Sequence, residues 1–141
     1  MRLFLDANVL FSAAVSPAGA SAGLIALAEA GACELVTSAL AVTEATRNLR
    51  AKAPAAMNRW GLVIAAVGLV PEADPRLLER VDVALESKDR PILAAALACR
   101  ATALVTGDRR HFGSLFGRAI GGTVVVPPRE ALEWLLTDLR A

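Results

Sequence analysis

The sequence predicts a three-layer α/β/α sandwich built around a mostly parallel sheet of roughly five strands, formed by a single domain over residues 1–141. Short apolar runs of strand length alternate with longer segments of helical pattern, as βα repeats require. The 141 residues are 55% hydrophobic and 21% charged, which suits one buried core. We find no internal repeat, low-complexity tract or linker that would divide the chain.

Five apolar runs are the strand candidates, at residues 3–5, 35–36, 67–70, 103–105 and 123–126. Six helices are expected. Five are at residues 20–30, 38–52, 54–60, 75–86 and 130–139, and the sixth starts near Pro91, with Asp89 or Arg90 as its cap and residues 92–98 as its buried body. Ser38 is a suitable N-cap, and prolines 54, 75 and 91 stand where a first helical turn accepts them. A segment with four glycines, residues 113–122, leads to the last strand.

Net charge, cysteine spacing and the lengths of the apolar stretches indicate which partners and which compartment the protein has. The net charge is only +1, so any nucleic acid must be attracted locally and not by the whole molecule. Cys33 and Cys99 are far apart and form no metal-binding motif, which favours a reducing compartment. The N-terminus lacks the apolar core of a signal peptide, and the longest nearly uncharged stretch, residues 61–71, is too short for a membrane span. We therefore expect a soluble cytoplasmic protein without membrane contact.

Four acids, Asp6, Glu44, Asp89 and Asp108, lie where an apolar run ends or within or at the start of a helix. In a parallel sheet the loops beyond the carboxyl ends of the strands form the ligand crevice, so these side chains are expected to meet in one cleft. Carboxylates gathered without matching bases repel one another unless a cation holds them. The pattern therefore indicates a divalent metal site and metal-assisted phosphodiester hydrolysis.

Each acid also has an ordinary structural interpretation. Asp6 or Asn8 could simply cap the helix that follows. Glu44 lies inside a helix, where glutamate is usually solvated. Asp89 precedes a proline and a helix, as an N-cap does, and Asp108 could be a turn acid. Cap and ligand roles are compatible, because a helix N-terminus keeps a carboxylate ionised. The coincidence of the four positions favours the functional interpretation.

Four segments, in this order and at these separations, resemble the PIN domain family, and closely its VapC-like toxin branch: LFLDANVLFSA, TSALAVTEATRNL, SKDRPILAAALA and VTGDRRHFG. The resemblance covers nearly the whole chain, and the first and fourth segments are the most specific. It implies a PIN-like sandwich and a metal-dependent ribonuclease. It also implies that Asp6, Glu44, Asp89 and Asp108 are both the catalytic residues and the ligands of Mg²⁺ or Mn²⁺.

The same resemblance implies roles for residues around the acids. Asn8 and Thr106 would support the cluster through hydrogen bonds. Independently of the resemblance, the charges themselves predict that Arg109 and Arg110, beside Asp108, bind the substrate backbone, as part of a basic rim that Arg47, Arg50 and Lys52 extend. Members of the family often carry an acid or amide near the position of His111; here the imidazole could line the cleft or be a partly buried spacer, and we favour the spacer.

The resemblance also implies partners: an RNA substrate, a second copy of the chain in a homodimer, and a cognate antitoxin that covers the acidic cleft. With water as the nucleophile, the products would carry a 5′-phosphate and a 3′-hydroxyl. Two rival interpretations remain open. One is a metal-dependent phosphatase with Asp6 as covalent nucleophile, although such enzymes usually carry an acid where this chain has Asn8. The other is a catalytically idle PIN-like module that binds RNA or protein.

Overall fold

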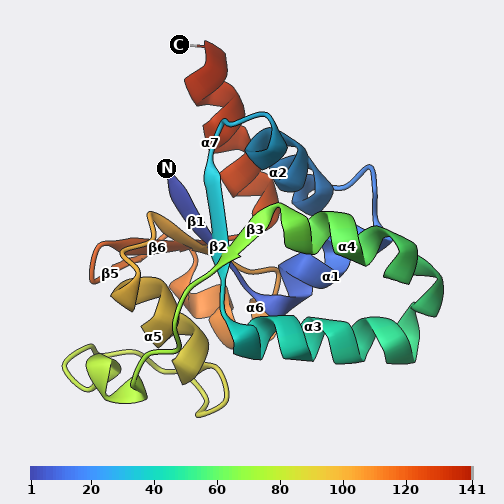
Figure 1. Cartoon of the computed structure of the whole chain (residues 1–141). Helices are drawn as coiled ribbons and strands as arrows, with labels where there is room; N and C mark the ends of the chain where they lie inside the picture. The colour runs from blue at the N-terminus through green and yellow to red at the C-terminus, as the bar shows by residue number, and fades with distance from the viewer. Residues whose placement is uncertain (141) are drawn as a thin grey trace.

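A computed structural model describes residues 1–140, which form one mixed sheet with helices on both faces (Figure 1). The strand order is β3-β2-β1-β4-β6-β5. The strands are β1 (Arg2–Leu5), β2 (Glu34–Thr37), β3 (Val67–Leu69), β4 (Ala103–Val105), β5 (Ala119–Ile120) and β6 (Thr123–Val126). All neighbours pair in parallel except β5, which runs antiparallel to β6. The predicted fold class and all five predicted strands are confirmed.

The sixth strand, β5, was not predicted from the sequence. It has only two residues and is joined to β6 through Gly121 and Gly122, which adopt φ of 55° and 89°. Positive φ at both central residues is what a tight hairpin of this kind requires, and glycine adopts it without steric cost. A two-residue strand leaves no periodic pattern in the sequence, so only the glycine pair indicated the turn.

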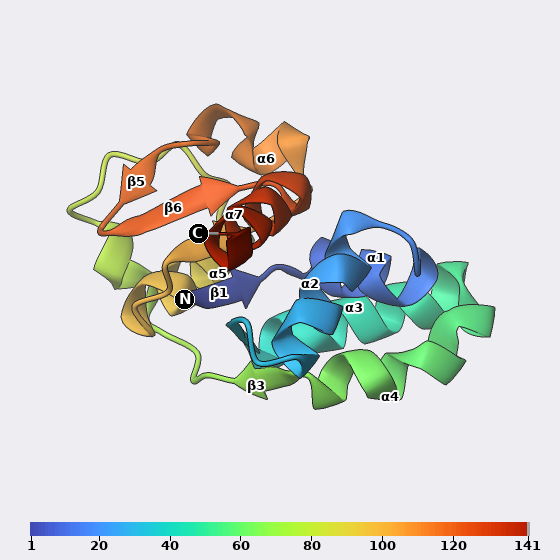
Figure 2. The same cartoon turned by 90° about the horizontal axis from the view of Figure 1, so that it is seen from above.

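The α-helices are α1 (Ala7–Val15), α2 (Ala20–Glu29), α3 (Ala39–Lys52), α4 (Met57–Ala65), α5 (Arg90–Ala98), α6 (Arg109–Phe112) and α7 (Pro128–Arg140). Helices α1 to α4 gather on one side of the sheet and α5 lies on the other (Figure 2), while α7 packs against α2. Among residues 1–140 no single helix has the length and apolar character needed to cross a membrane. Only α1 and α2 together, bent by 90°, meet that test of length and composition.

Local sequence explains where the helices start. The Ser38 hydroxyl accepts a hydrogen bond from the Ala41 N–H at 3.3 Å, so the predicted N-cap of α3 is confirmed. The helix predicted at residues 54–60 starts as a 3₁₀ turn, η1 (Pro54–Ala56), and continues as α4 to Ala65. Pro91 lies in the first turn of α5, as expected.

The helix predicted at residues 75–86 was wrong. Only a 3₁₀ turn, η2 (Pro75–Leu78), forms there, and the chain then reaches α5 without a regular element, through turns at residues 79–80 and 87–89 and irregular backbone at residues 82–86. Val81, Val83 and Leu85 are partly buried against the core, whereas the residues between them are exposed. That alternation is the period of an extended chain, and tertiary packing of every second side chain outweighed the helical spacing that the sequence also allows.

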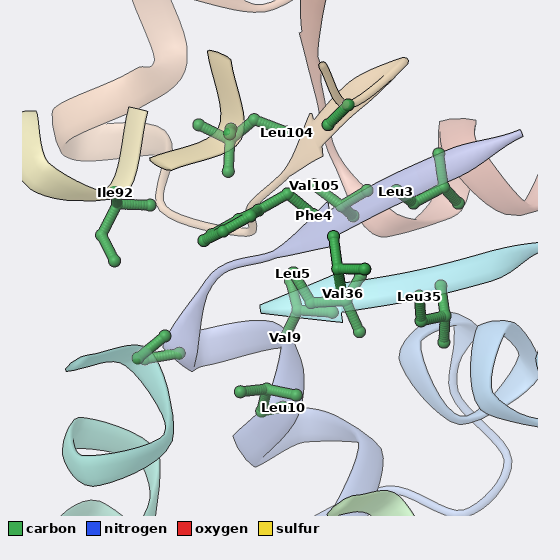
Figure 3. Packing of buried hydrophobic residues seen from close by; sticks show 14 of the residues in the cluster. Leu3, Phe4, Leu5, Val9, Leu10, Leu35, Val36, Ile92, Leu104 and Val105 are labelled. Carbon is green, nitrogen blue, oxygen red and sulfur yellow. The ribbon is translucent and has the colours of Figure 1, made fainter. Parts of the chain in front are cut away.

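The core lies on both faces of β1. Leu3, Phe4 and Leu5 are all completely buried. Phe4 points toward the side of Ile92 in α5, whereas Leu5 points toward Val9 and Leu10 in α1 (Figure 3). Burial of each such side chain is worth about 1.5–3 kcal/mol. This packing fixes β1 at the centre of the sheet, and therefore fixes the position of the residue that follows it, Asp6.

Candidate active site

The carboxyl ends of β1 and β4 place Asp6 beside Thr106. The two strands pair in parallel, with Leu5 opposite Val105, and the Asp6 N–H donates to the Val105 carbonyl at 3.0 Å. Asp6 is also the N-cap of α1, so its interpretation as a helix cap is confirmed. The cap position does not prevent its side chain from lining the crevice. Side chains at adjacent strand ends open into the same crevice, as the sequence pattern predicted.

Asp6 is held by three hydrogen-bond donors. Its Oδ1 accepts from the Ala7 N–H at 2.8 Å. Its Oδ2 accepts from the Thr106 hydroxyl at 2.8 Å and from the Asn8 amide at 3.0 Å. The Asn8 Oδ1 in turn accepts the Gly107 N–H at 2.7 Å, which ties the start of α1 to the loop after β4. The orientation of the Asp6 carboxylate is therefore fixed by its surroundings before any ligand arrives.

Burial raises the pKa of Asp6 to about 6, because the side chain is largely removed from water. Hydrogen bonds from Thr106, Ala7 and Asn8 lower the pKa, and the negative charge of Glu44 raises it further. The residue as a whole is only 6% exposed. A buried carboxylate that is costly to ionise without a counter-charge is well suited to a bound cation, which would favour the ionised form.

Asp108 and His111 form a compact unit at the start of α6. Asp108 Oδ1 accepts the His111 N–H at 3.0 Å, and Asp108 Oδ2 lies 2.8 Å from His111 Nδ1. The Asp108 N–H donates to the Thr106 hydroxyl oxygen at 3.2 Å, so this unit is joined to the Asp6 network. His111 is partly buried, as expected for a spacer. Its ring also contacts Asp108, one of the predicted catalytic acids, so it is not a spacer alone.

Asp89 stands at the N-cap position of α5, yet its side chain makes no capping hydrogen bond. Its Oδ2 is buried and has no hydrogen-bond partner among the described residues. The same oxygen lies 3.5 Å from His111 Nδ1, a separation too long for a good hydrogen bond. Burial raises the pKa of Asp89, and the neighbouring His111 partly offsets this. The predicted capping role of the side chain is thus wrong, and the carboxylate remains free to bind a ligand.

The four predicted acids line one cleft of about 540 Å³, which we call the acidic cleft. Its polar lining residues are Asp6, Asn8, Ser12, Glu44, Arg47, Asn48, Lys88, Asp89 and Asp108. Glu44 projects from α3 and is exposed. Four carboxylates thus face two basic side chains, an excess of negative charge that favours cations.

The four acids are not all in mutual contact. The described residues contain one group of three side chains whose potential ligand atoms lie within 4.8 Å of one another, formed by Glu86, Asp89 and His111. Glu86 Oε1 lies 3.7 Å from His111 Nε2. Asp89 belongs both to this group and to the acidic cleft, whereas the other three predicted acids are spread more widely around the cleft.

The structure also places residues that sequence reasoning missed. Ser12 lies one helical turn after Asn8 on α1, and this i, i+4 spacing could have revealed that both face the cleft. Lys88 and Glu86 belong to the segment between η2 and α5, most of which was wrongly predicted as a helix. Arg109 lies in a neighbouring pocket and Arg110 is exposed, so neither predicted substrate-binding arginine lines the acidic cleft itself.

A sheet of this topology with a buried carboxylate lining an acidic cleft defines an α/β protein whose cleft offers carboxylate oxygens to a ligand. The family model described as PIN domain matches residues 2–110. The chain belongs to the PIN domain family. No curated protein matches the chain.

Two solved structures share this fold. The structure of VapBC2 from Rickettsia felis, bound to a DNA fragment from their promoter, superposes with a TM-score of 0.63 and 16% identity, covering 90% of this chain and 98% of the other. PAE2754 from Pyrobaculum aerophilum superposes with a TM-score of 0.66 and 21% identity, covering 97% and 99%. At these identities the likeness concerns the fold.

Proposed function

We propose that this chain, as one PIN-like domain, is an endoribonuclease that uses Mg²⁺ or Mn²⁺ to hydrolyse RNA phosphodiester bonds. Membership of the PIN family and the acidic cleft support this activity. Asp6, Glu44, Asp89 and Asp108 are the proposed catalytic acids and metal ligands. The observation that carries the proposal is the buried Asp89 oxygen without a donor, on the same cleft as the buried carboxylate of Asp6.

The side chains present fit a hard divalent cation. Such ions prefer carboxylate oxygens, and four carboxylates line the cleft. A buried carboxylate oxygen without a donor is costly unless a cation or proton satisfies it. When bound, the metal supplies a more acidic water and neutralises charge that develops on the phosphate. Asp6 would be the central ligand, with Asp108, Asp89 and Glu44 completing the site.

The remaining residues orient these ligands. Asn8 and Thr106 direct the Asp6 carboxylate through its Oδ2, and His111 restrains Asp108. Support of this kind, in the layer around metal ligands, typically changes metal affinity or activity by about 10–100-fold. A phosphatase is disfavoured because Asn8 stands where such enzymes usually carry a second acid, and this amide is hydrogen-bonded to the Asp6 Oδ2.

We further propose that the chain is the toxin of a VapC-like pair, acting in the cytoplasm on RNA, held by an antitoxin and forming a homodimer. The fold likeness to a VapBC structure supports this role. Leu62 of α4 and Leu69 of β3 are 69% and 67% exposed, and such large apolar side chains suit a protein contact. The acidic cleft would suit a basic side chain of the antitoxin.

Incubation of the purified protein with total RNA, with Mn²⁺ or with EDTA, tests the activity. We expect Mn²⁺-dependent cleavage that leaves new 5′-phosphate ends, mapped by ligation that requires such ends. Calorimetric titration with Mn²⁺ of the native protein and of an Asp6→Asn, Asp108→Asn double variant tests the site, with binding expected only in the native protein.

Asp138→Asn is the matched control, because it makes the same chemical change at an exposed position of α7. The control should cut RNA and bind Mn²⁺ as the native protein does. Equal Mn²⁺ heats in the native protein and the double variant would refute the metal site. Strong RNA binding without cleavage in any divalent ion would instead favour the catalytically idle module.

A further inference from the structure

A second pocket, of about 380 Å³, adjoins the acidic cleft and differs from it in charge. The two share Ser12 and Gly107 in their linings. We call it the serine pocket, since Ser12, Ser16 and Ser21 line it. It is thus a direct neighbour of the proposed metal site, separated from it by one side chain of α1 and one backbone segment after β4.

The serine pocket carries positive charge. Arg109 of α6 and Arg129 of α7 line it, and no acidic residue does. Neither arginine forms an ion pair with any carboxylate of residues 1–140. The acidic cleft next to it holds four carboxylates. An anion is therefore favoured in the serine pocket and disfavoured, without a metal, in the acidic cleft.

The start of α2 adds unpaired donors to the same pocket. Its N-cap, Gly19, supplies no side-chain hydrogen bond, and the first N–H groups of this ten-residue helix have no acceptor within residues 1–140. Ala20 and Ser21, at this helix start, both line the pocket. A helix N-terminus with free N–H groups favours an anion, through the hydrogen bonds and through the helix dipole.

Ser21 is an independent sign of a ligand. It is 5% exposed, and its hydroxyl has no hydrogen-bond partner among the described residues. The Ser21 oxygen is not one of the fully buried atoms that lack a partner, so the hydroxyl keeps access to the pocket and can donate to a ligand oxygen there. The hydroxyls of Ser12 and Ser16 are also without a partner within residues 1–140. Hydroxyls, N–H groups and guanidinium groups are together the donors that a phosphate oxygen accepts.

From this arrangement we infer that the serine pocket is a phosphate subsite for the RNA backbone, which holds the phosphate next to the one cleaved in the acidic cleft. The inference rests on the proposed ribonuclease activity and adds a positioning role to it. The exposed Gly107 lies between the two sites and brings no side chain to obstruct a strand that passes from one to the other. In this arrangement Arg109, which lines the serine pocket and not the acidic cleft, binds the neighbouring phosphate.

Charge reversal at Arg129 tests the subsite. Arg129→Glu should raise KM for Mn²⁺-dependent cleavage of a short oligouridylate by about tenfold at low salt, the worth of a hydrogen bond to a charged group, with kcat within about twofold. In EDTA the Kd of the labelled oligouridylate should rise similarly. The slope of log Kd against the logarithm of the salt concentration should become shallower by about 0.7, which is the value for one fewer neutralised phosphate on a single strand. Ser21→Ala should act in the same direction with a smaller change.

Arg118→Glu is the matched control. It makes the same change of charge at an exposed arginine that lines neither pocket, and should leave KM, Kd and slope unchanged. Thermal unfolding of each variant separates misfolding from weaker binding. Equal effects of Arg129→Glu and Arg118→Glu would overturn the subsite while leaving the nuclease intact.

A titration of the native protein with inorganic phosphate, followed by amide NMR, tests the pocket without any reaction. The N–H signals of Ala20 and Ser21 should shift, and the shifts should disappear in Arg129→Glu. If the native protein cuts no RNA but binds the oligouridylate through Arg129, the subsite stands and the nuclease fails. NMR shifts with free phosphate, together with equal RNA affinity in all variants, would overturn the RNA role. Polyglutamate that displaces the oligouridylate as well as RNA of equal charge would overturn it too.

Discussion

The two halves of the acidic cleft are built in different ways. The half formed by the ends of β1 and β4, which we call the strand-end half, contains Asp6 and Asp108 and fixes both by hydrogen bonds. The half at the start of α5, which we call the α5 half, contains Asp89, whose Oδ2 has no donor within the described residues. One half is organised before a ligand arrives, and the other is left with an unsatisfied charge.

The difference follows from the chain that leads to each half. Parallel pairing of Leu5 with Val105 fixes the strand ends relative to each other, so Asp6 and Thr106 meet through backbone geometry alone. Asp89 is instead reached through a segment without a regular element, in which alternate side chains of residues 81–86 pack against the core and a turn at residues 87–89 leads to α5. The strand-end half therefore holds its carboxylates in fixed orientations. The α5 half supplies the carboxylate that a bound cation would stabilise most, since it has no hydrogen-bond donor within the described residues.

The largest expected effect comes from Asp89→Asn. We expect RNA cleavage to fall at least about 100-fold, since removal of a ligand should cost more than removal of the groups that support it. The stability of the metal-free protein should not fall, because the substitution removes a buried charge that has no donor. Initial rates with Mn²⁺ and chemical denaturation in EDTA measure the two quantities.

Asp6→Asn supplies the contrast, because Asp6 already has three donors. RNA cleavage by this variant should fall as much as in Asp89→Asn. The stability of the metal-free protein should change little at neutral pH, because the gain from removing a buried charge is offset by weaker hydrogen bonds. The asparagine amide cannot accept all three bonds that the carboxylate accepts. A native rate of cleavage by Asp89→Asn would remove that residue from the site and leave the comparison between halves without a functional meaning.

Sequence reasoning recovered the strand-end half because local pattern and fold agree there. An apolar strand followed by Asp6 and another followed by Thr106 and Asp108 must meet once the sheet is parallel. It failed at residues 75–86, where the apolar spacing allows a helix and packing selects an extended chain. It also underrated His111. The i, i+3 spacing between Asp108 and His111 could have revealed their contact, whereas the approach of His111 to Asp89 depends on how α5 and α6 lie relative to each other.

Core substitutions extend the comparison to stability. Leu5→Ala, at a completely buried position of β1, should lower the free energy of unfolding by about 2–5 kcal/mol. Leu85→Ala, in the segment between η2 and α5, should cost only about 1 kcal/mol because this side chain is partly exposed. Urea unfolding followed by circular dichroism gives both values. Similar costs at the two positions would mean that the segment between η2 and α5 is as firmly packed as the central strand.

Stability of the metal-free protein should depend on the ionisation of Asp6. Its pKa rises from 3.8 to about 6 on folding, so the folded state binds more protons between these values and stability falls as pH rises through this range. The loss from this group alone is about 3 kcal/mol. Denaturation in EDTA between pH 4 and pH 7, roughly the range spanned by the two pKa values, measures it.

The difference between native protein and Asp6→Asn isolates this group, because the other acids titrate in both. Saturating Mn²⁺ should flatten or reverse the dependence, since a bound cation favours the ionised carboxylate. A native protein whose stability in EDTA rises through this range, relative to the variant, would show that Asp6 is ionised at no cost and would weaken the case for a cation beside it.

The smallest expected effect concerns His111, which joins the two halves. His111→Ala keeps the backbone N–H bond to Asp108 but removes the imidazole ring beside it, and Mn²⁺ affinity should fall about tenfold, about 1.4 kcal/mol. His111→Asn places an amide near the position of Nδ1, where it can still donate to Asp108, and should restore most of the affinity. Calorimetry of both variants measures the change. Equal losses would assign His111 to packing, whereas recovery by asparagine alone would identify the hydrogen bond to Asp108 as the contact that prepares the strand-end half for the cation.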